Sequence, residues 1–148
     1  MNNKCWIFDI DGTLSNSSHR KHWVSSKPKN WAAWNAGMAE DGYHADVIDF
    51  INVAIAKNIT VIICTGREDT YRAITTNWLT DGGIYNYERM YMRKAKDYRP
   101  DDIVKKEMLD DIRAGGYNPV LAFDDRDRVV KMWRENGVRC FQVAEGNF

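Results

Sequence analysis

Five short apolar runs, separated by segments of helical periodicity, most constrain the fold of this 148-residue chain. Apolar runs rich in β-branched and aromatic residues are typical of buried strands. Strands that alternate with helical segments indicate a parallel sheet with helices on both faces, joined by right-handed crossovers. The sequence therefore predicts an α/β fold around a five-stranded parallel sheet, with strands at residues 4–10, 60–64, 89–92, 120–123 and 139–143.

We expect a Rossmann-like three-layer sandwich in which these strands, numbered along the chain, have the order 5-4-1-2-3. A chain of this length is sufficient for one domain with its own core, here residues 1–148. Residues 15–43 interrupt the alternation, because they are far longer than a usual connection between a strand and its helix. This insertion after the first strand is expected to form a small cap, with a short helix near residues 30–40.

The composition narrows the possible partners and location. The 21 basic and 21 acidic residues cancel, which counts against a large polynucleotide footprint but not against binding a strand end. No apolar run approaches the ~20 residues that span a bilayer, and the first strand begins too early to leave room for a signal peptide. Three cysteines near predicted strands indicate buried thiols in a reducing compartment. We expect a cytoplasmic protein without membrane contact.

Two carboxylates, Asp9 and Asp11, stand at the end of the first apolar run and are followed by Gly12 and Thr13. Alternate residues of a strand point to the same side, so the two carboxylates can share one face. Gly12 allows a sharp turn, and the amide and hydroxyl groups of this turn are donors. Acids beside donors suit a divalent cation and a phosphoryl group. The alternative is a hairpin turn, but the polar residues 15–20 do not read as a second strand.

Two further motifs follow strands in the same way. Residues 65–67 (Thr-Gly-Arg) follow the second strand, and Asp124 and Asp125 follow the fourth. Each is weak alone, since paired acids at a helix start are often only a cap. In open α/β sheets, however, ligands bind beyond the carboxyl ends of the strands, where the strand order reverses. With the first strand in the centre, these motifs converge with Asp9 and Asp11 on one site.

A lysine on the third helix is a candidate for binding phosphoryl oxygens. Asp101 and Lys105 are four residues apart, with the acid first, which is the better order for an ion pair along a helix. Such a pair could aim the ammonium group at a substrate, although a solvated helix face has the same pattern. Lys94 and Lys96, after the third strand, compete for the role, and we favour Lys105.

These motifs together resemble the haloacid dehalogenase superfamily of phosphotransferases: Asp-x-Asp-Gly-Thr after the first strand, Thr after the second, a helix Lys, and Asp-Asp after the fourth. Residues 99–107, 122–126, 130–134 and 137–144 further resemble the 3′-phosphatase domain of bacteriophage polynucleotide kinase–phosphatases. Two features depart from that branch. No Gly-x-x-x-x-Gly-Lys-Ser/Thr motif occurs, so the kinase half is absent. The cap differs in length and composition, so its substrate contacts cannot be carried over.

The resemblance implies that Asp9 attacks phosphorus to form an aspartyl-phosphate, while Asp11 protonates the leaving oxygen and then deprotonates water. It implies Mg²⁺ held by the Asp9 carboxylate, the Asp11 backbone carbonyl and Asp124, with Asp125 supporting or joining that set and counted among the catalytic residues. It also implies that Thr65, the Gly66 amide and Lys105 hold phosphoryl oxygens, that Arg67 grips phosphate and that Asp101 orients the basic side chains.

The cap carries polar and aromatic residues whose roles stay open. His19 and His22 lack further zinc ligands at a known spacing, so surface positions are expected. Their cluster with Arg20 and Lys21 could touch phosphate, and Arg20 is counted among the substrate-binding residues. Three tryptophans could stack on a base, but a small cap core is the favoured interpretation: Trp23, Trp31 and Trp34.

The expected function is a Mg²⁺-dependent phosphomonoesterase that removes 3′-phosphate from DNA or RNA ends in nucleic acid repair. The alternative is a nucleotidase for free (deoxy)nucleoside monophosphates or other small esters, which the zero net charge favours because polymer binding draws on many phosphate contacts. A phosphorylation-switched receiver module fits less well, because receivers carry their acceptor Asp after a middle strand. The expected partner is a phosphorylated nucleic acid end or nucleotide, with no obligatory protein partner.

Overall fold

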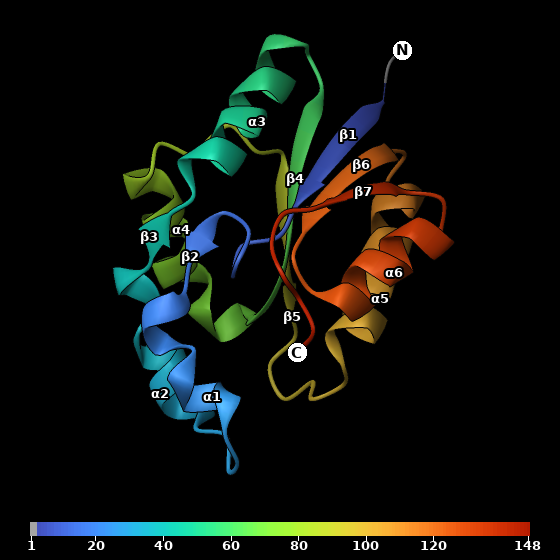
Figure 1. Ribbon diagram of the computed structural model, residues 1–148. Coiled ribbons are helices and arrows are strands. Elements are labelled where there is room, and N and C mark those ends of the chain that lie inside the picture. Colours follow the sequence, from blue (N-terminus) through green and yellow to red (C-terminus); the bar gives the residue numbers. More distant parts are fainter. Residues whose placement is uncertain (1–2) are drawn as a thin grey trace.

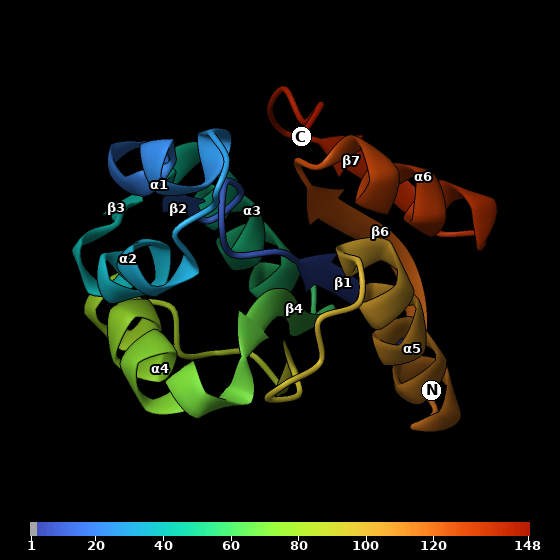
Figure 2. The same cartoon turned by 90° about the horizontal axis from the view of Figure 1, so that it is seen from below.

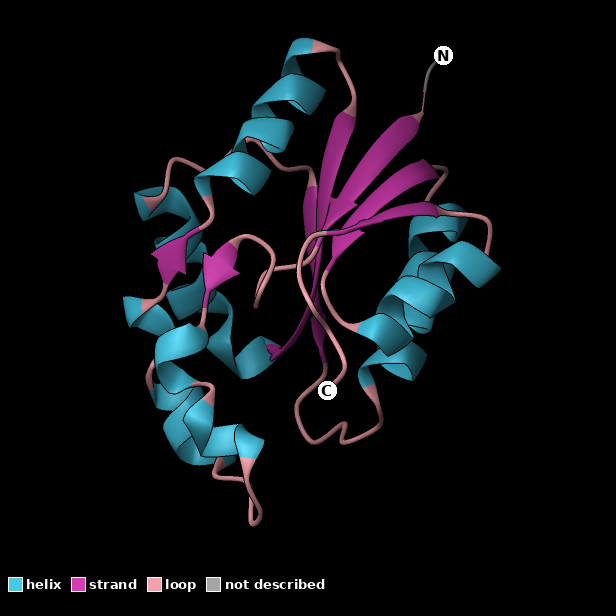
Figure 3. Ribbon diagram, viewed as in Figure 1, coloured by secondary structure: helices cyan, strands magenta, loops and turns pink. Residues whose placement is uncertain are grey.

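A central sheet of five parallel strands organises the protein, for which a computed structural model describes residues 3–148 (Figures 1 and 3). The order across the sheet is β5-β4-β1-β6-β7, and every neighbouring pair is parallel. This confirms the predicted α/β fold with a five-stranded parallel sheet. The strands are β1 (Lys4–Phe8), β4 (Thr60–Glu68), β5 (Arg89–Arg93), β6 (Asn118–Asp124) and β7 (Arg139–Gln142).

The strand numbers differ from the expected ones because two short strands of the cap, β2 (Ser15–Asn16) and β3 (Gly42–Tyr43), form a separate antiparallel pair. One boundary differs more substantially. The second apolar run was expected to end at residue 64, but β4 continues to Glu68 with a shift of register after Thr65. The Thr-Gly-Arg motif therefore lies in an irregular strand end rather than beyond it. Residues 1 and 2 of the expected domain lie outside the described part.

Helices cover both faces of the sheet and create two apolar cores. One core joins α5 (Asp101–Ala114) and α6 (Asp127–Glu135) to the sheet, and includes Leu109 and Trp133. The other joins α3 (Ala45–Ala56) and α4 (Arg72–Asp81) to the opposite face. Alternate strand residues supply each core, as the two-residue period of a strand requires. Within residues 3–148, no helix is long and apolar enough to cross a membrane.

The cap is built from short helical turns beside α4 (Figures 1 and 2). The expected helix near residues 30–40 is split at Gly37, and Asn30 caps its start by accepting a hydrogen bond from the Ala33 amide at 3.0 Å. The cap is fixed to the core by Trp78 of α4, which donates to the Asp41 carbonyl at 2.9 Å. The helical elements are η1 (Ser18–Arg20), α1 (His22–Ser25), α2 (Trp31–Ala36) and η2 (Met38–Glu40), with η3 (Asp69–Tyr71) between β4 and α4.

Candidate active site

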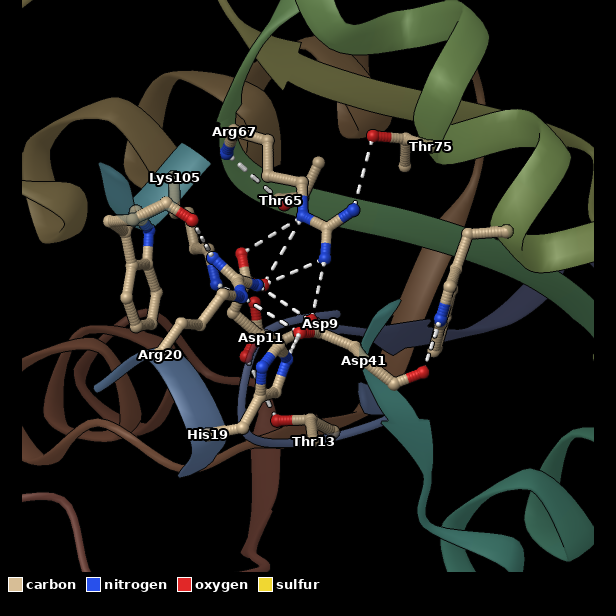
Figure 4. Close-up of polar contacts among 12 residues, drawn as sticks. Asp9, Asp11, Thr13, His19, Arg20, Asp41, Thr65, Arg67, Thr75 and Lys105 are labelled. Carbon is tan, nitrogen blue, oxygen red and sulfur yellow. Dashed lines mark hydrogen bonds and ion pairs between the residues drawn. The ribbon is translucent and has the colours of Figure 1, made fainter. Parts of the chain in front are cut away.

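Asp9 lies at the end of β1 with both carboxylate oxygens held by donors (Figure 4). Thr13 Oγ1 donates to Asp9 Oδ2 at 2.9 Å, and Lys105 Nζ donates to Asp9 Oδ1 at 2.9 Å. The turn that returns Thr13 to Asp9 passes through Gly12, whose φ of 82° is in the left-handed region. The Asp-x-Asp-Gly-Thr sequence thus folds into a turn that fixes its first carboxylate.

The paired acids of β6 meet Asp9 because β1 and β6 are neighbouring parallel strands. Phe8 is aligned with Phe123, and the Asp9 amide donates to the Phe123 carbonyl at 3.0 Å. Asp9, Asp124 and Asp125 are all buried, and each offers a carboxylate oxygen within 4.8 Å of the others. These three residues are called the acidic cluster below.

Gly12 also makes room for this cluster. A β-carbon at residue 12 would lie 2.1 Å from Asp125 Oδ2, which is far inside van der Waals contact. The turn after β1 and the Asp125 carboxylate therefore touch directly, and only glycine satisfies both the space and the φ angle at this position.

Lys105 enters the site from α5 and forms ion pairs with two members of the acidic cluster. Its Nζ lies 2.9 Å from Asp9 Oδ1 and 2.8 Å from Asp124 Oδ2. Lys94 and Lys96 are exposed. The structure thus brings Lys105 to Asp9, while its catalytic role stays a prediction.

The acidic cluster carries more negative charge than its surroundings compensate. Burial and the nearby Asp124 raise the pKa of Asp9 well above its ordinary value, and the same causes raise the pKa of Asp125 to about 6. Burial alone would lower the pKa of Lys105, but Asp124 and Asp9 outweigh it and raise that pKa. Three carboxylates and one ammonium group leave two negative charges when all are ionised. Oxygen ligands with this excess charge fit a hard divalent cation such as Mg²⁺.

Asp11 lies in a second cluster, with Arg20, Arg67 and Asp41 (Figure 4). Its carboxylate accepts hydrogen bonds from Arg67 Nη2 at 2.8 Å and from Arg20 Nη2 at 2.5 Å. Asp41 accepts from Arg20 Nε at 2.8 Å and from Arg67 Nη2 at 3.3 Å. Although burial raises the pKa of Asp11, Arg67 and then Arg20 outweigh it and lower that pKa to about 2. Asp11 is therefore ionised in the folded protein near neutral pH.

The Asp11 carboxylate lies outside the acidic cluster, which neither supports nor contradicts the expected metal contact, because that contact was its backbone carbonyl. Its carboxylate faces the two arginines, and Asp125 supplies the third carboxylate beside Asp9 and Asp124. The chain turns after β1, and the Asp11 side chain points toward Arg20 of the cap. The expected contribution of the Asp11 backbone carbonyl stays a prediction.

The expected ion pair between Asp101 and Lys105 is wrong. Asp101 instead pairs with Arg93 and with Arg126, whose Nη1 lies 2.8 Å from Asp101 Oδ2. Lys105 turns toward the sheet because two carboxylates attract it there. Asp101 still lies beside the expected phosphate-binding segment, since a β-carbon at Gly66 would be 3.0 Å from Asp101 Oδ1.

The remaining expected binding residues are buried in the core of the site. Thr65 is fully buried, and its Oγ1 accepts a hydrogen bond from the Arg67 amide at 3.2 Å. Arg67 reaches Asp11 from the end of β4 and also donates to Thr75 at 3.2 Å. Arg20 comes from the cap and is only 1% exposed, so the cap is part of the site.

Two residues of the site were missed. Asp41 gave no sequence signal, because the cap has no periodicity that would place it. A buried Arg20 requires an acidic partner such as Asp41, but the burial of Arg20 was not foreseeable from the sequence. Trp133 of α6 is fully buried, and its Nε1 donates to Asp124 Oδ2 at 3.2 Å.

The expected tryptophan core of the cap is wrong for two of its three members. Trp23 is 42% exposed and Trp31 is 55% exposed. Trp34 is half-buried, and its ring covers the Arg20 guanidinium, with 4.0 Å from Cζ to the ring centroid. The cap is too small to enclose three indole rings, so two of them face outward.

Comparison with solved structures gives the same fold. The protein in the structure of a Pnkp1/Rnl/Hen1 complex is 34% identical, with a TM-score of 0.81, over 99% of this chain and 48% of that one. The Class C acid phosphatase from Bacillus anthracis with tungstate bound is 16% identical, with a TM-score of 0.71, over 99% of this chain and 68% of that one. The second likeness concerns the fold alone.

A viral relative has a similar sequence. A protein of Autographa californica nuclear polyhedrosis virus, named as a bifunctional polynucleotide kinase/RNA ligase, is 25% identical over 130 residues, which are 87% of this chain and 17% of that protein. This chain therefore spans about half, or less, of the length of these relatives. The expectation of no obligatory protein partner is contradicted by the similar Pnkp1, which was solved in complex with other proteins.

The sequence also matches a family profile almost from end to end. That profile is the phosphatase domain of polynucleotide kinase PNKP, and it covers residues 3–148. The resemblance to the haloacid dehalogenase superfamily, and to this branch of it, is confirmed. The chain belongs to the family of polynucleotide kinase phosphatase domains, and is by that membership a phosphoric monoester hydrolase.

Proposed function

We propose that this chain is a Mg²⁺-dependent phosphatase that removes 3′-phosphate from DNA or RNA ends through an aspartyl-phosphate on Asp9. One observation carries the proposal: Asp9 has both carboxylate oxygens fixed, by Thr13 and Lys105, beside two further buried acids. A fixed, desolvated carboxylate next to an ammonium group suits attack on a phosphoryl group, whose transfer depends on positioning and charge stabilisation.

In the proposed reaction, Asp9 forms a bond to phosphorus while the bond to the leaving 3′-oxygen breaks. Asp11 lies two residues away and is proposed to supply the proton that the leaving oxygen takes up. Because Arg67 and Arg20 keep Asp11 ionised in the free protein, it must first take up a proton when a bound phosphate draws those arginines away. Water then attacks the aspartyl-phosphate, Asp11 accepts its proton, and free Asp9 and inorganic phosphate result. Lys105 stabilises the charge on the phosphoryl oxygens in both steps, with Thr65 and the Gly66 amide as further donors.

Asp9, Asp124 and Asp125 would hold the Mg²⁺ ion, which when bound neutralises charge on the phosphoryl oxygens. Trp133 and the Asp125 amide hold the Asp124 carboxylate in position, with the amide donating to Asp124 Oδ1 at 2.9 Å. Arg67 and Arg20 present planar donors that suit phosphate as well as carboxylate. A bound phosphate would therefore share them with Asp11 and Asp41.

Phosphate release tests the proposal. Three substrates are compared: a 3′-phosphorylated oligonucleotide, a nucleoside 3′-monophosphate and a nucleoside 5′-monophosphate. Each is assayed once with Mg²⁺ and once with EDTA. The proposal expects release from the 3′-phosphorylated end that needs Mg²⁺ and is lost in Asp9→Asn. Preference for free monophosphates would favour the nucleotidase alternative, and a stable phospho-form without turnover would favour a receiver module. Release that survives Asp9→Asn would overturn the assignment of the nucleophile.

The similar Pnkp1 was solved within an RNA repair complex, Pnkp1/Rnl/Hen1. We infer that this chain too acts in RNA repair together with other proteins that process or join the same ends. Co-expression with such proteins from the same source, followed by size-exclusion chromatography, tests this directly. A cytoplasmic location stays a prediction.

A further inference from the structure

The cap, residues 15–43, contains more basic than acidic residues. Residues 12–39 contain four basic residues and no acidic residue, whereas the rest of the chain contains the other 17 basic and all 21 acidic residues. Arg20 is used inside the site, but Lys21, Lys27 and Lys29 are exposed. Glu40 and Asp41 end the cap, and Asp41 pairs with Arg20, so four basic and two acidic residues leave the cap with two excess positive charges beside the site.

Aromatic side chains are interleaved with these lysines. Trp23 and Trp31 are exposed, although burial of an indole ring is strongly favourable. The Lys29 ammonium group lies 5.4 Å from the centroid of Trp31. The Asn30 amide donates to the Trp23 carbonyl at 2.7 Å, so the end of α1 lies beside the start of α2. We call Lys21, Trp23, Lys27, Lys29 and Trp31 the cap face.

The cap face begins at the proposed active site. Arg20 contacts Asp11 and stacks on Trp34, and Trp31 is one turn before Trp34 on the same side of α2. Lys21 follows Arg20, and its Nζ lies 4.6 Å from the centroid of the Phe148 ring. Arg126, which follows Asp125, donates to the Phe148 carbonyl at 2.7 Å. The cap face therefore extends outward from the proposed active site, in which a phosphorylated end would lie.

Two kinds of macromolecule could cover such a face. The cores of protein–protein interfaces are depleted in lysine, and a protein partner would need acids to match these cations. Single-stranded nucleic acid fits without further requirements: lysines track its phosphates, and aromatic rings stack on bases of any sequence. The mixture of exposed Trp and Lys without any acid favours the second occupant.

We propose that the cap face binds the single strand that leads to the phosphorylated end, so that the chain acts on polynucleotides in preference to mononucleotides. This rests on the proposed function. It names the surface that binds the nucleotides beyond the terminal one and assigns stacking to Trp31 and Trp23.

The test compares substrates of different length. KM is measured for a nucleoside 3′-monophosphate and for a 3′-phosphorylated single-stranded decanucleotide, with Mg²⁺, for wild type, Trp31→Ala, Trp31→Phe and Lys27→Ala/Lys29→Ala. Stacking worth about 1–3 kcal/mol per base predicts that Trp31→Ala raises KM for the decanucleotide, relative to the monophosphate, by roughly 5-fold or more. Trp31→Phe should bring the ratio of the two KM values, decanucleotide to monophosphate, most of the way back to that of wild type. Lys106→Ala/Lys131→Ala, on α5 and α6, is the matched control and should leave the ratio unchanged.

Salt dependence provides a second readout. A plot of the logarithm of the binding constant against the logarithm of the salt concentration has a slope whose magnitude falls by about 0.7 for each lost contact to a single-strand phosphate. Lys27→Ala/Lys29→Ala should therefore reduce that magnitude by about 1.4. The proposal is overturned if wild type has the same KM for the decanucleotide and the monophosphate. It is also overturned if the cap variants change the KM values of both substrates by the same factor. Should the chain hydrolyse no 3′-phosphate at all, fluorescence anisotropy of a labelled decanucleotide still tests the cap face, because Trp31→Ala must weaken that binding.

Discussion

Asp9 and Lys105 are 96 positions apart in sequence, yet their side chains form a buried ion pair of 2.9 Å. The same ammonium group reaches Asp124, so one lysine joins the end of β1, the end of β6 and helix α5. Removing it would leave two or three carboxylates buried without a protein counter-charge. Lys105 therefore stabilises the fold in addition to its proposed role in the reaction.

Lys105→Met should destabilise the protein by about 3–5 kcal/mol, because a buried pair that loses one partner leaves an uncompensated charge. Chemical denaturation without Mg²⁺ measures the free energy of unfolding. The control is Lys106→Met, which breaks only an exposed pair with Asp110 and should cost at most about 0.5 kcal/mol. The double variant Lys105→Met/Asp9→Asn should recover part of the loss. Equal effects at positions 105 and 106 would contradict the buried pair.

Gly12→Ala should abolish most phosphatase activity, since its β-carbon would displace the Asp125 carboxylate. Gly83 provides a matched control: its φ of 78° is nearly the same as the 82° of Gly12, but nothing lies within 4 Å of an added β-carbon. Gly83→Ala should therefore cost only the left-handed backbone strain, about 1–2 kcal/mol of stability, and should retain activity. If both variants lose activity alike, strain and not the displaced carboxylate is responsible.

Without a bound cation, Asp125 should make the protein less stable as the pH rises. Its pKa is about 6 when folded, above the ordinary value of 3.8, so the stability it contributes is complete below about pH 4 and is lost as the pH rises through 6. In EDTA, Asp125→Asn should then be more stable than wild type at pH 7, with the difference shrinking toward pH 4. Thermal melts over this range give the comparison. A difference that stays constant with pH would contradict the raised pKa.

Mg²⁺ should raise the melting temperature of wild type and not that of Asp124→Asn. A ligand at 100 times its Kd stabilises a protein by about 2.7 kcal/mol when it binds only the folded state. Calorimetric titration with Mg²⁺ gives the affinity independently of activity. Asp111→Asn, an exposed acid of α5, is the control and should respond to Mg²⁺ as wild type does. A Mg²⁺ response unchanged in Asp124→Asn would move the cation site elsewhere.

Arg20→Lys should lower both stability and kcat/KM although the charge is retained. One planar guanidinium group contacts Asp41 through two nitrogens, touches Asp11 and stacks on Trp34. An ammonium group cannot make these contacts together. We expect a loss of about 1–3 kcal/mol in unfolding free energy, measured by denaturation, because buried donors and acceptors are left unpaired. Lys21→Arg, on the exposed side of the same segment, should change neither quantity by a comparable amount.

Much of the site was predictable where it depends on the sheet. Acids that follow neighbouring parallel strands must lie close together, and this holds for Asp9 and Asp124. The partners of Asp101 were not predictable, because Arg93 and Arg126 come from other elements and compete with the lysine one turn along the helix. In the cap, aromatic spacing is the same for a core and for an exposed face, so the exposure of Trp23 and Trp31 could not be read from the pattern.

The alignment of β1 with β6 has a consequence for the time at which the site can exist. Pairing between segments so distant in the chain is slow to form, since a long loop must close first. During synthesis, the ribosome releases Asp9 long before Asp124 and Asp125. A nascent chain thus exposes the first carboxylate of the acidic cluster without its companions, and the proposed site can assemble only after they have emerged.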